Sequence, residues 1–224
     1  MKKVFILALA IVCSVSLFAQ EKMYIHKSDK CTLGALISAT DSVSFSTDGL
    51  ITYFRVNDSL AAFPTSEIDS LTFGPNSSII YITYNGSDVS VINPLAFEGV
   101  TVSVSGSDVT VNSVSEMQDI TYSLTGTTTN GMFKIYSAKR YFLQLNSINI
   151  TNADGPAINV QAEKKTSVEL MAGTQNTLTD GAVYAAAALN GNGEEEDQDA
   201  AFFSEAKLVF SGSCSLTING NGLS

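Results

Sequence analysis

One pattern of short β-like runs is written three times between Gly131 and Gly220. Each copy holds three runs of alternating apolar residues, with turn residues between them and no helical periodicity. Ile135 and Val160 occupy the same place in the first and second copies, 25 residues apart. A repeat of this length cannot bury its apolar face alone, so the copies must stack on one another. The pattern therefore predicts an all-β protein built around a right-handed parallel β-helix (solenoid).

The predicted strands follow directly from the repeat. The sequence places them at residues 132–135, 142–145 and 148–152 in the first copy, 157–160, 168–170 and 177–181 in the second, and 201–203, 208–210 and 216–220 in the third. An insertion rich in Gly, Asn and acidic residues separates the second copy from the third. We expect this insertion to leave the stack as a loop, because its composition favours turns over strands.

Two smaller β-rich segments precede the repeats at 131–224. Residues 20–76 are predicted to form a leader module that is itself doubled, since Asp41-Ser-Val-Ser-Phe45 returns as Asp69-Ser-Leu-Thr-Phe73. A structural spacer is the role we expect for it. Residues 79–130 are predicted to form a β-rich N-terminal cap, in which the turn sequence Gly-Ser-Asp occurs twice before alternating valines. Antiparallel strands here would cover the first copy, because an open solenoid end exposes strand edges and core.

The first 19 residues are predicted to be an export signal. Lys2 and Lys3 form a basic start, Val4–Val12 is an apolar run, and small residues lead to a cleavage site after Ala19. The apolar run is too short to span a membrane, and no comparable run follows it. An alternative is a lipoprotein acylated at Cys13. The mature chain is thus expected to be secreted, at the cell surface or in the periplasm.

Charge limits the partners that this chain can have. Removing the two signal lysines lowers the net charge from −10 to −12. Such a surface repels nucleic acid and anionic lipid, and it repels an acidic polysaccharide unless a cation bridges the two. Cys31 and Cys214 lie in different segments, and we expect two separate buried thiols rather than a disulfide.

Several phrases of the sequence together resemble one protein family. They are Gly126-Thr-Thr-Thr-Asn-Gly131, Phe133-Lys-Ile-Tyr136, Ile148-Asn-Ile-Thr-Asn152, Asp154-Gly-Pro-Ala-Ile158, Asn176-Thr-Leu-Thr-Asp-Gly181 and Asp199-Ala-Ala-Phe-Phe203. Residues 79–224 are similar to secreted bacterial carbohydrate-binding domains with a pectate-lyase-like parallel β-helix. The resemblance implies binding of calcium and of plant polysaccharides such as cellulose and polygalacturonate. Because the family continues for further repeats, we expect either a C-terminally truncated fragment or end-to-end self-association through the open last copy.

Carboxylates are the candidate calcium ligands. The densest charge cluster lies in the insertion, and two further carboxylates stand at strand-to-turn corners. Calcium takes six to eight hard oxygen ligands, and a glycine-rich loop can supply several of them. A solvated acidic loop and ordinary turn formers are the alternative interpretation. The candidates are Glu194, Glu195, Glu196, Asp197 and Asp199 in the insertion, with Asp154 and Asp180 at the corners.

The candidate glycan contacts are aromatic and basic residues near the repeats. The chain has no Trp, the residue that most often forms a flat platform for a sugar ring. Tyr136, Tyr141 and Tyr184 are the aromatic candidates, and the Lys139-Arg140 pair is the basic candidate. The basic pair would meet a carboxylated sugar, or it would simply decorate a turn. Four phenylalanines are predicted to belong to the core: Phe133, Phe202, Phe203 and Phe210.

Catalysis is the weaker functional class. The only histidine, His26, lies in the leader module, and the only arginines are Arg55 and Arg140. No histidine-dependent catalytic group therefore exists in the repeats. A calcium-dependent polysaccharide lyase and a structural, adhesin-like surface solenoid remain the alternatives. The sequence favours a non-catalytic polysaccharide-binding protein assisted by calcium.

Overall fold

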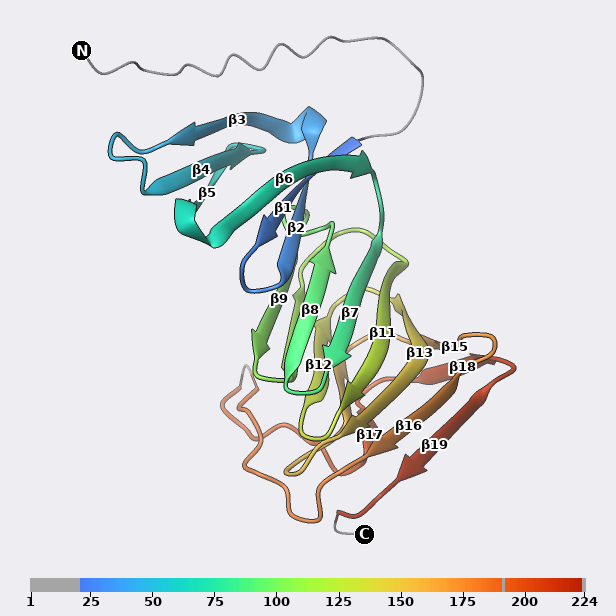
Figure 1. The fold of residues 1–224 in the computed structure, drawn as a ribbon. Coiled ribbons are helices and arrows are strands. Elements are labelled where there is room, and N and C mark those ends of the chain that lie inside the picture. The colour runs from blue at the N-terminus through green and yellow to red at the C-terminus, as the bar shows by residue number, and fades with distance from the viewer. Residues whose placement is uncertain (1–20, 191, 223–224) are drawn as a thin grey trace, which may run out of the picture.

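The structure is a computed structural model that describes residues 21–190 and 192–222. Over these residues the protein is all-β, as predicted, with mixed sheets of eleven and five strands and an antiparallel sheet of three. Figure 1 shows the strands running from the leader module at one end to the third copy at the other. No described helix is long and apolar enough to cross a membrane. The predicted signal falls on residues outside the described ranges and stays a prediction.

The leader module consists of two equivalent halves, each with two strands, a single-turn 3-10 helix and a third strand. The first half contains β1 (Glu21–Lys27), β2 (Cys31–Leu36), η1 (Ile37–Ala39) and β3 (Thr40–Phe45). The second contains β4 (Ile51–Val56), β5 (Ser59–Pro64), η2 (Thr65–Glu67) and β6 (Ile68–Pro75). The doubling predicted from the repeated Asp-Ser-x-x-Phe sequence therefore corresponds to a doubled set of elements.

The two halves exchange their third strands. β6 of the second half pairs with β1 of the first, and β3 of the first half pairs with β4 of the second, all antiparallel. Each half therefore supplies two strands of one sheet and one strand of the other. Met23, Ile25, Ala35, Phe54 and Val56 from both halves form a common buried core. Neither half can complete its sheet without the other.

The first part of the predicted cap consists of two antiparallel hairpins, whereas β11 (Ile120–Thr128), which the prediction also assigned to the cap, pairs in parallel with its neighbours. β7 (Ile79–Asn85) and β8 (Asp88–Asn93) form the first, and β9 (Val100–Ser105) and β10 (Asp108–Ser113) form the second. Gly86 and Gly106 occupy the turns with positive φ. β7 and β10 then pair in parallel with the first strands of the repeats, and β2 of the leader module pairs in parallel with β8. The cap strands therefore pair antiparallel with one another and in parallel with the strands that follow.

The copies pair strand by strand in parallel. Their strands are β11 (Ile120–Thr128), β12 (Met132–Ser137), β13 (Tyr141–Thr151), β14 (Ile158–Ala162), β15 (Thr166–Leu170), β16 (Gln175–Thr179), β17 (Phe202–Ser204), β18 (Leu208–Gly212) and β19 (Ser215–Asn219). The parallel series are β10–β12–β14–β17, β7–β11–β13–β15–β18 and β13–β16–β19. The two runs predicted at 142–145 and 148–152 are joined in β13, where Ser147 has positive φ and makes a bulge.

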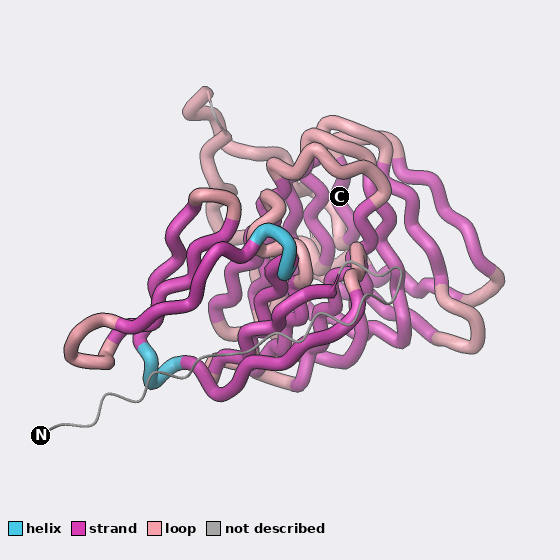
Figure 2. The backbone as a smooth tube through the Cα atoms, turned by 90° about the horizontal axis from the view of Figure 1, so that it is seen from above, coloured by secondary structure: helices cyan, strands magenta, loops and turns pink. Residues whose placement is uncertain are grey.

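The pairing register stacks like residues in the interior. Val111, Ile135 and Val160 lie opposite one another on three neighbouring strands, and all three are fully buried. Their stacking keeps each apolar residue on the inner face, because a shift of one residue would turn the whole strand outward. Figure 2 shows the strands following one another in layers, with the connecting loops at their ends.

The last copy is less buried than the copies before it. Phe210 and Ile218 are 48% and 49% exposed, whereas Phe133 is fully buried. Phe210 was expected in the core, and the structure corrects this, because a neighbouring copy covers only one side of its strand. Its ring meets Phe202 edge to face at 5.9 Å. End-to-end self-association through this copy stays a prediction.

Both described cysteines are free thiols, as expected, but they are half-buried rather than buried. Cys31 lies on β2, and its partial burial raises its pKa to about 11. The Cys214 Sγ accepts a hydrogen bond from the backbone N–H of Gly173 at 3.0 Å. The fold therefore depends on packing and backbone pairing without a covalent link between these two residues.

Because neighbouring strands approach closely at only one of them, two glycines with positive φ should differ in how much an alanine substitution destabilises the fold. A Cβ at Gly126 would lie 2.1 Å from the Tyr84 carbonyl oxygen, whereas a Cβ at Gly106 would meet nothing within 4 Å. Gly106→Ala should cost about 1–2 kcal/mol of unfolding free energy from its φ alone. Gly126→Ala should cost about 3 kcal/mol or more, because overpacking is added. Urea denaturation measures both, and equal losses would contradict the close approach.

Candidate functional site

Basic residues line up on the turns between β12 and β13, β14 and β15, and β17 and β18. Tyr141, Thr166 and Leu208 begin the strands after these turns and pair in register. The residues just before them, Arg140, Lys165 and Lys207, therefore follow one another at the strand spacing of about 4.8 Å. Lys139 and Lys164 precede two of them. We call these five residues the basic row: Lys139, Arg140, Lys164, Lys165 and Lys207.

A groove of about 420 Å³ runs along the basic row. Its lining consists of Lys139, Arg140, Lys164 and Lys165 with two neutral residues, and no carboxylate lines it. The row holds five of the 12 Lys and Arg residues of a chain with a net charge of −10. Cations thus gather around one groove of an otherwise acidic protein.

The cations of the row differ in their partners. Lys139 pairs with Glu116 at 2.7 Å and Arg140 with Asp119 at 3.4 Å, and both pairs are exposed. Exposed pairs of this kind contribute little, so an anionic ligand can replace them at small cost. Lys164, Lys165 and Lys207 are exposed and form no ion pair within the described residues. Glu163 and Glu205 precede them on the same turns but lie outside the groove lining.

The structure separates the predicted glycan contacts. Lys139 and Arg140 line the groove. Tyr141 is only 2% exposed and packs edge to face on Tyr122, so its ring is not available to a ligand. Burial also raises its pKa. The Tyr136 hydroxyl donates to Glu196 at 2.8 Å, and that of Tyr184 donates to Asp180 at 2.6 Å. The two tyrosines hold loops and lie apart from the basic pair.

Phe142 is the exposed aromatic residue next to the basic row, and the sequence reasoning missed it. It is 39% exposed, while Tyr141 and Leu143 on either side are buried. Strand alternation requires one of each neighbouring pair to face outward. The register Ile120–Tyr141 places the tyrosine on the inner face, and the phenylalanine therefore faces solvent.

The acidic insertion, described at residues 182–190 and 192–200, folds back over the outer face of β12 and β14. Glu196 pairs with Lys134, and the exposed fractions of the two residues are only 9% and 6%. The Gln161 Nε2 donates to the backbone oxygen of Asp197 at 2.8 Å. The backbone N–H of Ala185 donates to the Asp154 carbonyl at 2.7 Å. The insertion is therefore fixed to the stack by hydrogen bonds and one buried ion pair.

This arrangement does not gather the predicted calcium ligands. Within the described residues, no group of three or more His, Cys, Asp or Glu side chains is placed to hold a metal ion. Glu196 turns inward to Lys134, while its four acidic neighbours in the insertion are exposed: Glu194, Glu195, Asp197 and Asp199. Asp199 does share a cavity with Asp180 at the third copy. Two carboxylates alone supply fewer oxygens than calcium needs.

Asp180 clamps the chain after β19. Its carboxylate accepts hydrogen bonds from the Tyr184 hydroxyl and from the backbone N–H groups of Asn221 and Gly222. Burial alone would raise the Asp180 pKa, but these hydrogen bonds outweigh it and lower the pKa below its usual value. The carboxylate is thus occupied by protein donors, which favours a structural role over cation binding.

A second carboxylate pair lies beneath the insertion. Asp108 and Asp154 line a cavity of about 350 Å³ together with Asn152 and Lys134. Partial burial raises the Asp108 pKa, and the negative charge of Asp154 raises it further. A bound cation would relieve the repulsion that Asp154 exerts on the ionised Asp108 carboxylate. Asp108 was missed in the sequence because Gly-Ser-Asp reads as an ordinary turn.

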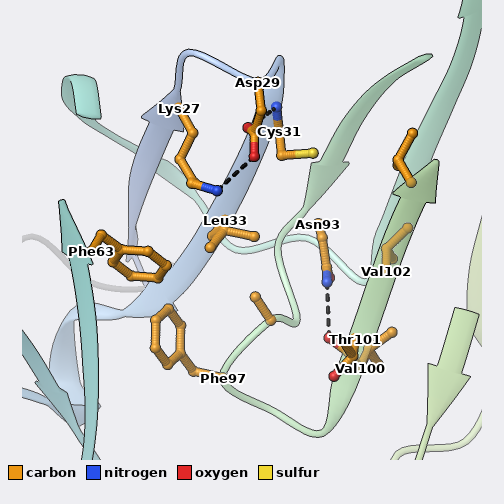
Figure 3. Close-up of a pocket in the computed structure, with 12 residues that line it drawn as sticks. Lys27, Asp29, Cys31, Leu33, Phe63, Asn93, Phe97, Val100, Thr101 and Val102 are labelled. Atoms are coloured by element: carbon orange, nitrogen blue, oxygen red, sulfur yellow. Dashed lines mark hydrogen bonds and ion pairs between the residues drawn. The ribbon is translucent and has the colours of Figure 1, made fainter. Parts of the chain in front are cut away.

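The cavity between the leader module and the cap has a different character. It measures about 410 Å³, and Figure 3 shows Phe63, Phe97 and Leu33 among its lining residues. Its polar groups already satisfy one another. Lys27 pairs with Asp29 at 2.6 Å, and Asn93 donates to the Val100 carbonyl at 2.9 Å. This cavity therefore offers fewer unpaired polar groups to a sugar than the groove along the basic row does.

Comparison with known proteins supports a carbohydrate ligand. A family model described as "carbohydrate-binding domain-containing protein" matches residues 105–224, more than half of the chain. The chain belongs to this family. All residues of the basic row lie inside the matched segment.

The chain is similar to a solved structure of the polysaccharide lyase-like protein from C. thermocellum, a gadolinium derivative. The sequences are 25% identical, and the TM-score is 0.50. The match covers 63% of this chain and 52% of the other, so the chain spans about half the length of that protein. No curated protein matches the chain.

The Asp180 clamp predicts an acid-sensitive contribution to stability. Because its folded pKa is depressed, the carboxylate stabilises the fold above its unfolded pKa of about 4. That contribution is lost as the pH falls through the folded value. Asp180→Asn should lower stability at neutral pH and should flatten the acid limb of a stability–pH curve measured by urea denaturation. Asp69→Asn, at an exposed carboxylate on β6, is the control. An unchanged acid limb in Asp180→Asn would contradict the clamp.

Proposed function

We propose that this protein is a non-catalytic polysaccharide-binding protein that holds an acidic glycan against the basic row. The observation that carries the proposal is the groove lined by four cations and no carboxylate. Membership of a carbohydrate-binding family supplies the ligand class. A polysaccharide of carboxylated sugars repeats its charge along the chain, as the basic row repeats its cations from one copy to the next. Matched repeats allow several weak contacts to act together.

We infer further that the parallel series form a right-handed parallel β-helix. Support comes from three sets of strands that pair in parallel in the same order, copy after copy. In such a solenoid each added copy extends both the core and the turns. The basic row would then lie along one edge of the solenoid.

A cellulosic glycan is the second candidate ligand, and Phe142 is the observation that favours it. An exposed ring two residues after Arg140 offers an apolar face on which a sugar can stack. Neutral glycans gain little from cations, whereas the groove lining is mainly cationic. We therefore rank the acidic glycan first. The plant origin proposed for this glycan rests on the family resemblance. Export of the protein, which would bring it to the glycan, rests on the predicted signal.

Calcium remains part of the proposal as a bridging ion. The predicted ligands in the acidic insertion are spread apart, so we assign the ion to the carboxylate pair Asp108 and Asp154 instead. This pair supplies too few oxygens for complete coordination, and Asn152 with carboxylates of the glycan would supply further ones. Bound calcium would neutralise the pair and offset the repulsion between the acidic protein surface and an acidic ligand.

If the basic row binds the glycan, removing its unpaired cations should lower the affinity for polygalacturonate. The double variant Lys164→Gln and Lys165→Gln should weaken binding to polygalacturonate roughly five- to thirtyfold, since each exposed ionic contact contributes about 0.5–1 kcal/mol. Raising the salt concentration should weaken wild-type binding more than variant binding. Isothermal titration calorimetry with polygalacturonate, and with cellulose fragments as the neutral ligand, measures both effects.

Arg55→Gln is the matched control for this experiment. Arg55 is an exposed cation on β4 of the leader module, outside the matched family segment. Equal losses in the control and the double variant would contradict a local site. Absence of any glycan binding by the wild type would favour the adhesin-like alternative. Appearance of an unsaturated, ultraviolet-absorbing product over time would favour the lyase alternative.

The bridging calcium predicts a conditional effect of Asp108→Asn. Without calcium the variant should be as stable as the wild type or more stable, because repulsion by Asp154 is removed. With calcium the midpoint of thermal unfolding should rise for the wild type and much less for the variant. A hundredfold excess over the dissociation constant adds about 2.7 kcal/mol.

Glu194→Gln separates the two candidate calcium positions. It removes an exposed carboxylate from the acidic insertion and leaves the pair beneath it unchanged. A calcium shift lost in Glu194→Gln but kept in Asp108→Asn would place the ion in the insertion. A wild type that shows no shift, with or without polygalacturonate, would refute the calcium proposal altogether.

A further inference from the structure

Three polar side chains are buried together where the acidic insertion covers β12 and β14. They are Lys134, Asn159 and Glu196, with exposed fractions of 6%, 1% and 9%. Lys134 and Asn159 point away from the apolar core, since they alternate with the core residues Ile135 and Val160. The acidic insertion covers this outer face, where Glu196 contacts Lys134 and the Asp197 backbone oxygen accepts a hydrogen bond from Gln161. Burial of such groups costs free energy, so their placement calls for an explanation.

Asn159 carries an unsatisfied amide. Its Nδ2 is buried and has no hydrogen-bond partner within the described residues. Its Oδ1, in contrast, accepts a hydrogen bond from the Gln161 Nε2 at 2.8 Å. A buried amide that is bound at its oxygen and free at its nitrogen is uncommon in a folded protein. The hydrogen bond from Gln161 polarises the Asn159 carbonyl. No hydrogen bond within the described residues holds the Asn159 Nδ2 in place.

Lys134 lies next to this amide. Lys134 and Asn159 are opposite each other on neighbouring parallel strands, whose spacing is about 4.8 Å. Both side chains stand on the same face, and the four-carbon stem of lysine is flexible and longer than this spacing. The Lys134 Nζ is in contact with the Glu196 carboxylate. The buried Lys134 amine therefore contacts a carboxylate, and its strand position is paired with that of the buried Asn159 amide.

We propose that Lys134 and Asn159 form an intramolecular isopeptide bond, promoted by Glu196. The Lys134 Nζ attacks the Asn159 Cγ, a bond forms between these atoms, and the bond from Cγ to Nδ2 breaks. One ammonia molecule leaves. The product is a secondary amide that joins β12 to β14, and the step is an acyl transfer that needs no oxidant, reductant or cofactor.

Each neighbour has a defined part in this step. Glu196 accepts a proton from the Lys134 ammonium and passes it to the departing nitrogen, as a general base and then a general acid. The Gln161 amide donates to the Asn159 oxygen, where negative charge develops during attack. The Tyr136 hydroxyl donates to the second oxygen of Glu196 and holds it in place. The shield of the insertion keeps water away from the reacting carbon.

The reaction is expected to be slow and to occur once per chain. Pairing with Glu196 and the neighbouring Tyr136 raises the Lys134 pKa against the opposing effect of burial, so the reactive neutral amine is a minor form. Asp108 and Asp154 line a cavity together with Lys134 and add further negative charge near its amine. The bond would link the first copy to the second across 25 residues of chain, in a protein whose two described cysteines are free.

Mass spectrometry of the full chain tests the proposal. The wild type should be lighter than its sequence by one ammonia molecule, in a fraction that grows during storage. Tryptic digestion should yield a branched peptide that joins residues 56–139 to residues 141–164, because trypsin does not cleave at an acylated Lys134. The branched peptide is decisive, since cyclisation of asparagine or of a terminal glutamine also releases ammonia elsewhere in the chain.

Matched variants identify the groups. Asn159→Ala and Lys134→Arg should each abolish the branched peptide, and Glu196→Gln should abolish it or slow its formation at least tenfold. Glu195→Gln, at the exposed neighbour, should leave the rate unchanged. Absence of the branched peptide from fresh and long-stored wild-type protein would overturn the proposal, and the three groups would then be a buried ion pair beside an amide. A cross-link that persists in Asn159→Ala would also overturn it.

Discussion

The in-register parallel pairing of the copies is the constraint on which the other features depend. Val111, Ile135 and Val160 stack because each strand repeats the residue beneath it, and a slip of one position would expose all three. The same register fixes the turns. Arg140 and Lys165 lie at matching positions because the strands that follow them are paired residue by residue. The packing of the apolar interior therefore determines where the cations on the surface are placed.

Two buried lysines connect the non-repeating segments to the paired strands. Lys22 of the leader module is fully buried and binds both Glu98 and the carbonyl oxygen of Pro94 in the cap. Lys134 binds Glu196 of the acidic insertion. Removing one partner of a buried pair leaves an uncompensated charge and typically costs about 3–5 kcal/mol. Such pairs have strict geometry, so they fix segments whose own sequence specifies no regular structure.

Sequence reasoning located the copies well because the inner face repeats. The spacing from Ile135 to Val160 predicted which strands would pair, and the structure pairs them. It was less successful for side chains whose surroundings come from distant segments. Tyr141 is buried where an exposed platform was expected, because only the register shows which of Tyr141 and Phe142 faces inward. Glu196 looked like part of a solvated acidic run, since its partner Lys134 lies far away in the sequence.

The acidic surface and the proposed acidic ligand are compatible because of the range of electrostatic forces. At physiological ionic strength the Debye length is about 8 Å, so distant carboxylates of this chain hardly affect a ligand in contact with the basic row. Arg140, Lys165 and Lys207 stand just before strand starts that are about 4.8 Å apart and act on the same ligand segment. Long-range repulsion would slow the encounter, whereas short-range contacts would set the lifetime of the complex. A divalent cation at the Asp108–Asp154 pair would affect both the encounter rate and the lifetime of the complex. It would neutralise negative charge next to the stack, and it would attract the carboxylates of the glycan.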